Sequence, residues 1–547
     1  MPLFGPPNVG KLRAKGNTAG LLKVLATRKD SSARQDAAVA LGALGNVRAI
    51  GPLIVALRDP SRKVVQAAID ALVKFGPDAH TPLLAALGDE DYRSRAASAW
   101  ALGQISEVLC DSTLLWRSTE MLIASLRDDH ELVREASARA LARTADPRAM
   151  KPLRDTLRDT RSVVRVAAAF ALAQIGLASN EEAVRRQAVT QLAIALEDSD
   201  VTVRQTAARA IGDLGAELHN GELKDSVMAR LGAALNDPEL GVSCSVADAL
   251  GIVADVRAVR PLFNVVLSQT VEKELGLRAL EAIVRIGAPA VDELVPMLLD
   301  KDDHVRDRVA NVLDRLSWVP GQSREGAAYW LSRRNWHECV EIGEAAADVL
   351  AEEIGSDDYE TRVRAGEALV SIGEPAVGAV LKLLSDDDVS LRERAAGLLD
   401  QIGWEPCSDE VGAIYWVTKG LWDMAIESGG SAIVPIVRAL REGDFEARQA
   451  AANALDVLGW HPTEPEDRVT FSVMAHHWNT CREIGGSTVE ALITTVLLHS
   501  DEDVKREAAC VLIDLAESDS LEDKYRELLL SKYDVVVVPY CAGRSLE

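Results

Sequence analysis

Histidine and cysteine side chains one helical turn apart are the first residues whose spacing could support chemistry. His477 and Cys481 have this spacing, and His476 and His461 lie nearby in the sequence. Imidazole and thiolate groups are the ligands that zinc prefers in proteins. Cys481, however, aligns with Cys339 in a related segment, at a small apolar position, and a free cysteine is often a buried packing residue. We therefore interpret Cys481 as a core residue and expect no metal site.

Motifs for enzymatic chemistry are absent from the sequence. It contains no phosphate-binding glycine loop, no nucleophile elbow and no HExxH zinc motif. His-Glu dipeptides occur only at 130–131 and 337–338. We expect no catalytic residue and no cofactor.

Aromatic residues recur in three related segments of 26 residues, here called the cassettes: 318–343, 404–429 and 460–485. The cassettes hold eight of the ten tryptophans. Each has two aromatic residues seven positions apart, such as Tyr329 and Trp336, and seven residues are almost two helical turns. This spacing predicts that each cassette is one inserted helix with a buried aromatic stripe.

Two further tryptophans, one in each of the first two cassettes, would lie about 100° away from that stripe. Basic residues follow both of them. An exposed tryptophan beside cations suits the centre of a protein interface, although a half-buried tryptophan at a repeat junction remains an alternative. The expected partner-binding residues are Trp330, Arg333, Arg334, Trp416 and Lys419.

The remainder of the chain is built from a repeated phrase, as the segments 157–176, 196–215 and 384–403 show. Each copy has an Arg, or a residue in its place, eleven positions before a closing small residue. Thirteen copies are found, anchored at positions 34, 65, 95, 134, 165, 204, 243, 276, 306, 362, 392, 448 and 505. A sustained repeat of this length is typical of a solenoid.

Each copy is predicted to be a helical hairpin. In one second helix, Val203, Ala207, Ile211 and Leu214 form an apolar stripe that Gly215 ends. Neither helix of a hairpin can bury its apolar face alone, so neighbouring hairpins must stack. We expect an all-α fold: a right-handed α-solenoid of about thirteen hairpins with three inserted helices.

The phrase L-x-D-x5-R-x-x-A-x-x-A-L-x-x-[IL]-G resembles the HEAT-like repeat of the phycobilisome lyases, over residues 21–516. The resemblance implies a solenoid fold and a ladder of charges between repeats. Proteins with such repeats include interaction scaffolds, bilin lyases and DNA glycosylases. The resemblance therefore says little about function.

Regularly spaced charges support a structural ladder in place of an active site. An Asp stands six residues before most anchor positions, where it could cap a helix, and the Arg could pair with the Asp of its own or an adjacent repeat. The ladder is expected to comprise Asp89, Arg95, Asp128, Arg134, Asp159, Arg165, Asp198, Arg204, Asp300, Arg306, Asp386 and Arg392.

The distribution of charge bears on the partner. Residues 1–200 carry 27 Lys and Arg against 23 Asp and Glu, whereas residues 201–547 carry 33 against 61. An acidic array repels nucleic acid, which argues against a glycosylase-like function and favours a protein partner with a basic surface. The scattered cysteines, the lack of an apolar leader and the lack of a membrane-spanning run predict a soluble cytoplasmic protein.

We thus expect four regions: an N-terminal cap (1–20), a regular array (21–317), repeats with the three cassettes (318–485), and a last repeat with a C-terminal cap (486–547). The favoured function is a non-enzymatic scaffold or adaptor that binds protein partners. The alternative is an enzyme similar to a bilin lyase, in which the groove holds a tetrapyrrole.

Overall fold

The structure is a computed structural model that describes residues 9–26, 29–107, 111–215, 221–268, 272–518, 521–537 and 539–540. Within these residues every regular element is a helix, and none is a strand. They form two compact units, residues 1–319 and 320–547, called here the N-terminal and C-terminal units. Residues 1–8 of the expected N-terminal cap, and 538 and 541–547 of the expected C-terminal cap, lie outside the described residues.

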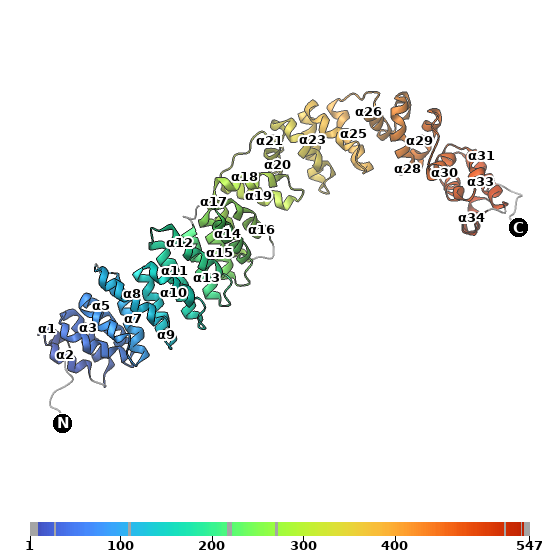
Figure 1. Ribbon diagram of the computed structural model, residues 1–547. Coiled ribbons are helices and arrows are strands. Elements are labelled where there is room, and N and C mark those ends of the chain that lie inside the picture. Colours follow the sequence, from blue (N-terminus) through green and yellow to red (C-terminus); the bar gives the residue numbers. More distant parts are fainter. Residues whose placement is uncertain are drawn as a thin grey trace. The chain divides into compact units, whose positions relative to one another are not determined.

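The N-terminal unit is a stack of helical hairpins preceded by α1 (Val9–Ala14) (Figure 1). The first helices of the hairpins are α2 (Thr18–Leu25), α4 (Ile50–Val55), α6 (Pro77–Ala86), α8 (Ser112–Ser125), α10 (Met150–Thr156), α12 (Glu182–Ala195), α14 (Glu222–Ala234), α16 (Val259–Leu267) and α18 (Ala288–Leu294). The second helices are α3 (Ser31–Leu44), α5 (Arg62–Phe75), α7 (Tyr92–Ser106), α9 (Glu131–Thr144), α11 (Ser162–Ala178), α13 (Val201–Gly215), α15 (Leu240–Val253), α17 (Lys273–Ile286) and α19 (Asp303–Arg315).

The C-terminal unit has the same construction and ends with α34 (Asp523–Val536). Its first helices are α20 (Arg324–Ser332), α22 (Glu344–Glu352), α24 (Val377–Leu383), α26 (Glu410–Thr418), α28 (Ile433–Glu442), α30 (Pro465–Met474) and α32 (Val489–Leu498). Its second helices are α21 (Trp336–Ile342), α23 (Tyr359–Ile372), α25 (Val389–Ile402), α27 (Trp422–Glu427), α29 (Phe445–Val457), α31 (Trp478–Ile484) and α33 (Glu502–Ala516).

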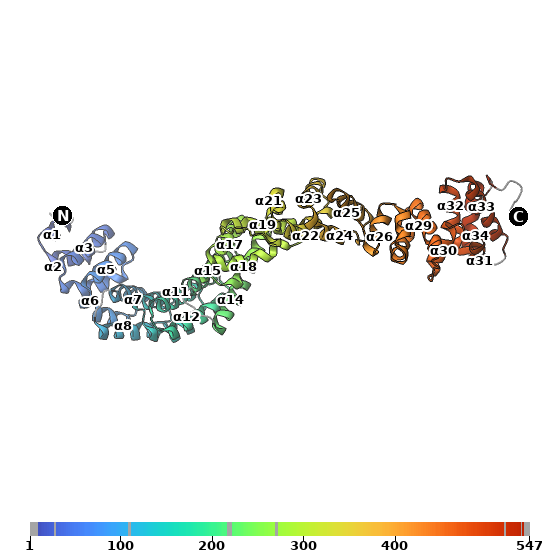
Figure 2. The same cartoon turned by 90° about the horizontal axis from the view of Figure 1, so that it is seen from above.

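Short 3₁₀ helices precede or extend several first helices. They are η1 (Val47–Ala49), η2 (Ala56–Arg58), η3 (Pro147–Ala149), η4 (Val256–Ala258), η5 (Val295–Leu299), η6 (Glu353–Gly355), η7 (Glu374–Ala376), η8 (Gly429–Ala432) and η9 (Gly485–Thr488). Within each unit the hairpins follow one another in chain order (Figure 2). The predicted α-solenoid is confirmed, and all thirteen anchor positions lie in second helices.

Close packing between second helices depends on their small residues. A Cβ atom added at Gly103 of α7 would lie 2.7 Å from the Cα of Ala140 in α9, and the same holds between Gly251 of α15 and Ala282 of α17. Buried Ala, Leu and Val residues fill the remaining space between neighbouring hairpins. These helices therefore approach more closely than larger side chains would allow.

Each cassette folds differently from its prediction. The first forms α20 and α21, the second α26 and α27, and the third α30 and α31, so each cassette is a short hairpin of two helices and not one inserted helix. The first helix of each cassette packs on the first helix of the next hairpin, and the second on the second. The cassettes are therefore shortened extra repeats within the stack.

The break between the two cassette helices has the same geometry in all three copies. Arg334, Gly420 and His476 occupy the same cassette position, and all have a positive φ, of 53°, 69° and 60°. The next residue donates its N–H to a carbonyl five residues back, as Leu421 does to Trp416 at 2.8 Å. A left-handed residue with this hydrogen bond is the usual end of an α-helix.

The described residues contain no helix long and apolar enough to cross a membrane.

Candidate functional site

Four of the ladder arginines make two kinds of contact. Arg134 donates from Nε and Nη2 to the two carboxylate oxygens of Asp159, in the next hairpin, at 2.7 and 2.8 Å. Its Nη1 donates to the carbonyl oxygen of Asp128 at 2.9 Å, in the turn of its own hairpin. The guanidinium therefore ties the turn of one repeat to the turn of the next.

Four ladder arginines pair in this way with an aspartate of the adjacent repeat, one of the two pairings expected, and Arg34 makes the same bidentate pair with Asp59. The pairs join consecutive repeats, and their side chains are between 8 and 17% exposed: Arg95–Asp128, Arg134–Asp159, Arg165–Asp198 and Arg204–Asp237. Arg165 and Arg204 also repeat the Nη1 contact to the carbonyls of their own turns. A bidentate pair with little exposure to water is held by geometry as well as charge.

The other ladder residues differ from the expected pairing. Asp89 pairs with Arg58 from the end of η2, because the anchor position before it is a valine. Arg306 pairs with Asp303 of its own helix, and Arg392 pairs with a glutamate. Asp300 and Asp386 accept backbone N–H groups, from Asp302 and Asp388.

The capping role expected for the ladder aspartates is also shifted by two residues. Asp89 accepts the N–H of Asp91 at 2.8 Å, and it is Asp91 that caps α7 by accepting the N–H of Arg93. Before α25, Asp386 likewise accepts the N–H of Asp388, and Asp388 caps the helix. In these two turns the ladder aspartate holds the turn and the aspartate two residues later caps the helix, whereas Arg161, two residues after Asp159, makes no side-chain cap.

Burial and hydrogen bonding act in opposite directions on the ladder carboxyls. Burial raises the pKa of Asp159, but the hydrogen bonds from Arg134 and from the N–H of Arg161 outweigh it, and the net pKa is below its usual value of 3.8. The pKa values of Asp59, Asp128 and Asp237 are lowered in the same way. These carboxylates are ionised and already hydrogen-bonded within the fold, as expected of residues that hold neighbouring repeats together.

The tryptophans of the cassettes are not divided into a buried and an exposed set. Trp330 and Trp416 are half-buried, as are Trp336 and Trp422. The turn between the cassette helices falls inside the seven-residue spacing, so that Tyr329 and Trp336 do not share one helical stripe. Trp416 and Trp422 pack against the same apolar cluster, which includes Ala425, Ile436 and Leu455. Trp330 and Trp416 are thus half-buried, as the alternative interpretation of the sequence expected.

The basic residues of the expected partner site have partners within the chain. Arg333 lies over the ring of Tyr329, with 5.6 Å between the guanidinium carbon and the ring centroid, and Arg334 is 3.8 Å from Asp358. Lys419 is 2.7 Å from Asp400. That these residues and the two tryptophans contact a partner stays a prediction.

A tyrosine of the second cassette joins the same network. Tyr415 donates its hydroxyl to Asp400, and burial together with that hydrogen bond raises the pKa of Tyr415 to about 12. Asp400 thus links the second cassette to α25.

The histidines and cysteine first considered as metal ligands have other surroundings. Cys481 is buried, and burial raises its pKa to about 11. His477 is 3.2 Å from Asp456, and His476 stacks on Trp478. The described residues include no group of three or more His, Cys, Asp or Glu side chains placed to hold a metal ion.

The second cassette borders a cavity of about 320 Å³ in the C-terminal unit, called here the cassette pocket. Its apolar wall comes from α25, α26, α27 and α28, and consists of Val389, Ile414, Val417, Trp422, Val434 and Pro435. The second helix of this cassette, α27, has only six residues, whereas the flanking second helices α25 and α29 have 14 and 13. The short α27 leaves space between these longer helices.

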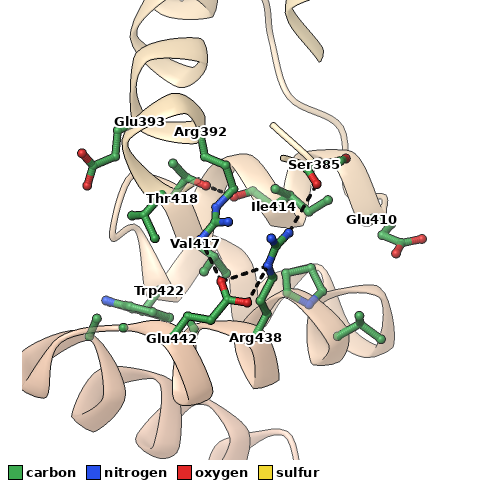
Figure 3. Close-up of a pocket in the computed structure, with 16 residues that line it drawn as sticks. Ser385, Arg392, Glu393, Glu410, Ile414, Val417, Thr418, Trp422, Arg438 and Glu442 are labelled. Atoms are coloured by element: carbon green, nitrogen blue, oxygen red, sulfur yellow. Dashed lines mark hydrogen bonds and ion pairs between the residues drawn. The ribbon is translucent and has the colours of Figure 1, made fainter. Parts of the chain in front are cut away.

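Ion pairs close one side of the pocket by reaching across the cassette (Figure 3). Arg392 of α25 contacts Glu442 of α28 at 3.2 Å, although 50 residues separate them. Arg438 contacts the same carboxylate at 3.1 Å and Asp387 at 2.7 Å, and it donates to the carbonyl of Asp386 at 2.9 Å. The charge ladder therefore passes over the second cassette and continues in the next hairpin.

Carboxylates flank this cluster. Glu393 and Glu410 line the pocket, lie on opposite sides of the two arginines in Figure 3, and are exposed. Among the described residues, no hydrogen bond or ion pair involves either carboxylate. Since both arginines are already paired, the charges that the pocket presents to a ligand are negative.

The sequence contains one signal for this site. Glu442 occupies the ladder acid position before the anchor at 448, and the nearest preceding ladder arginine is Arg392. A pair between these two residues requires that the turns on either side of the second cassette lie close together.

Comparison with known families is consistent with the observed hairpins. The family described as HEAT repeats matches residues 18–103, 80–173 and 119–189. Residues 18–189 are therefore similar to HEAT repeats. No curated protein matches the chain.

Similar solved structures share low identity with the chain. Yeast importin-β (Kap95p) is 15% identical, with 96% of this chain and 70% of that chain covered and a TM-score of 0.43. YibA of Escherichia coli is 19% identical, with 58% and 100% covered and a TM-score of 0.36. An engineered protein is 21% identical, with 81% and 99% covered and a TM-score of 0.29.

Proposed function

We propose that the protein is a non-enzymatic scaffold whose C-terminal unit binds a protein partner with a basic surface. The observation that carries this proposal is the division of charge between the two units. Residues 320–547 carry 20 Lys and Arg against 43 Asp and Glu, a net charge of −23, whereas residues 1–319 carry 40 against 41. A field concentrated on one unit speeds the capture of a partner of opposite charge and fixes where it docks.

The repeats support this function because a stack of hairpins offers a long, continuous surface on which a protein partner can bind. The recurring Asp and Arg of the phrase support placing the repeats with the HEAT-like repeats of the phycobilisome lyases. The expected site residues of the first two cassettes belong to the acidic unit.

The test uses the full chain as bait in an extract of the cells that make it, at 50 and 500 mM salt, followed by calorimetry with the captured protein. We expect a basic partner whose affinity falls at least tenfold at high salt, since exposed charges are screened within about 10 Å at 0.1 M. A partner that is not basic, or an affinity that does not depend on salt, would contradict the proposal.

Two charge-reversal variants separate the field of the C-terminal unit from total charge. Each replaces five exposed acidic residues by Lys, so both have the same net charge. The first changes Glu360, Glu374, Asp423, Glu483 and Glu507 of the C-terminal unit, and the second changes Asp36, Asp78, Asp213, Glu281 and Asp292 of the N-terminal unit. Binding should weaken in the first variant only. Equal losses would show that location does not matter.

A further inference from the structure

The cassette pocket combines an apolar interior with a negatively charged rim. Its volume of about 320 Å³ is at the small end of the range of about 300 to 1,000 Å³ for ligand sites, which suits one or two side chains better than a cofactor. Val389 and Val434 at its edge are 44% and 67% exposed. Exposed apolar groups beside a cavity are the usual form of a docking site for an apolar anchor.

The charges around the pocket indicate the chemistry of the occupant. Glu442 and Asp387 together already neutralise Arg392 and Arg438, and the turn carbonyls occupy further N–H groups of both arginines. An acidic ligand would have to displace these contacts. A basic ligand would instead meet the exposed carboxylates of Glu393 and Glu410 within a unit of net charge −23.

We propose that the cassette pocket binds one apolar side chain of a partner segment whose neighbouring Lys or Arg side chains contact Glu393 and Glu410. The apolar side chain packs on Ile414, Val417 and Trp422, and the basic side chains lie over the rim. This inference rests on the proposed function and names the place and the kind of segment that the acidic unit recognises.

The experiment selects peptides from a random display library on the full chain and measures the enriched peptide by fluorescence anisotropy. We expect peptides with a large apolar residue next to at least two Lys or Arg. Replacing the apolar residue by Ala should weaken binding at least tenfold. Enrichment of basic peptides that share no apolar residue would overturn this inference alone, and enrichment of acidic peptides would overturn the proposed function as well.

Two variants of the protein test the pocket itself. Thr418→Trp fills the cavity from the end of α26 and should weaken the enriched peptide at least tenfold. Glu393→Lys with Glu410→Lys changes only exposed residues and should weaken it about tenfold. The matched control, Glu483→Lys with Glu507→Lys, makes the same change of charge on exposed residues of α31 and α33, and should have a much smaller effect.

The outcomes separate the two levels of the proposal. If a basic peptide binds in a salt-dependent way but its affinity is the same for both pocket variants as for the unchanged protein, the acidic unit binds basic partners and the pocket is the wrong site. Circular dichroism and melting temperature of each variant show whether it is folded. Since the rim variants alter no buried residue, they decide the question even if Thr418→Trp perturbs the fold.

Discussion

At the scale of single residues, the ladder arginine is the group on which the contact between repeats depends. Its guanidinium has five N–H donors, and in Arg165 they reach Asp198 of the next hairpin and the carbonyl of Asp159 in its own turn. Removing the side chain leaves the Asp198 carboxylate with the N–H of Asp200 but without its cation, in a region with little access to water. That loss costs more than the loss of a surface ion pair.

Arg165→Ala should therefore lower the free energy of unfolding by about 3 kcal/mol in urea denaturation. The control is Arg186→Ala, whose contact with Glu182 in the same helix is 3.8 Å long and exposed. Its effect should be much smaller. Equal effects of the two substitutions would mean that the ladder contributes no more than surface charge.

The lowered pKa values of Asp59, Asp128, Asp159 and Asp237 make a prediction about acid. A carboxyl whose folded pKa lies below its unfolded value of 3.8 stabilises the fold above that pH, and this contribution is lost as the pH falls through the folded pKa. The melting temperature should be nearly constant from pH 6 to 5 and fall steeply below pH 4. In Arg134→Gln the fall should be shallower, because the pKa of Asp159 returns toward its usual value.

At the scale of elements, the cassettes are hairpins because their two helices are separated by a left-handed residue. Close contact at the start of the first helix also restricts the sequence. In the second cassette, a Cβ atom on Gly412 would overlap the carbonyl oxygen of Cys407 in the preceding loop. Asp409 holds this loop against the helix by accepting the N–H of Gly412 at 2.8 Å. The loop and the helix can pack together only if this residue is glycine.

Gly412→Ala should destabilise the C-terminal unit by about 2 kcal/mol or more, because the loop must move away from α26. Gly397→Ala is the matched control, since Gly397 lies inside α25 with no atom within 4 Å of an added Cβ. It should stabilise by up to about 1 kcal/mol through helix propensity. Thermal unfolding of both variants measures the difference, and shifts of the same sign would contradict the packing argument.

At the scale of the whole molecule, the two units have the same construction but very different charge. Repulsion among like charges opposes the folding of a unit with net charge −23 and has little effect on one with net charge −1. Salt screens that repulsion. The stability of the two units should therefore respond differently to ionic strength.

Hydrogen exchange followed by mass spectrometry can measure this difference in the intact chain. Raising NaCl from 20 to 500 mM should slow exchange in α28, α29, α32 and α33 severalfold, and leave α9, α11 and α13 nearly unchanged. The N-terminal helices serve as the internal control. The same slowing in both units would show that salt acts through a general effect and not through the charge of the C-terminal unit.

The sequence by itself determined the hairpin architecture, the thirteen anchor positions and the acidic character of the C-terminal unit. Helical periodicity is a local property, and a phrase that recurs along the chain reports it many times. The ladder position was visible for the same reason. The sequence did not show which repeat the arginine would reach, because Arg165 and Asp198 are 33 residues apart and meet only when the hairpins stack.

Only the tertiary structure decided how the cassettes fold and where the pocket lies. The helix break occurs at Arg334, Gly420 and His476, and a glycine marks it in the second copy alone. The seven-residue aromatic spacing fits a continuous helix equally well, so the local pattern could not separate one helix from two. The cassette pocket depends on the short helix α27 between the longer α25 and α29, and on Arg392 meeting Glu442 across the cassette. Both are consequences of packing between distant segments, which periodicity along the chain does not report.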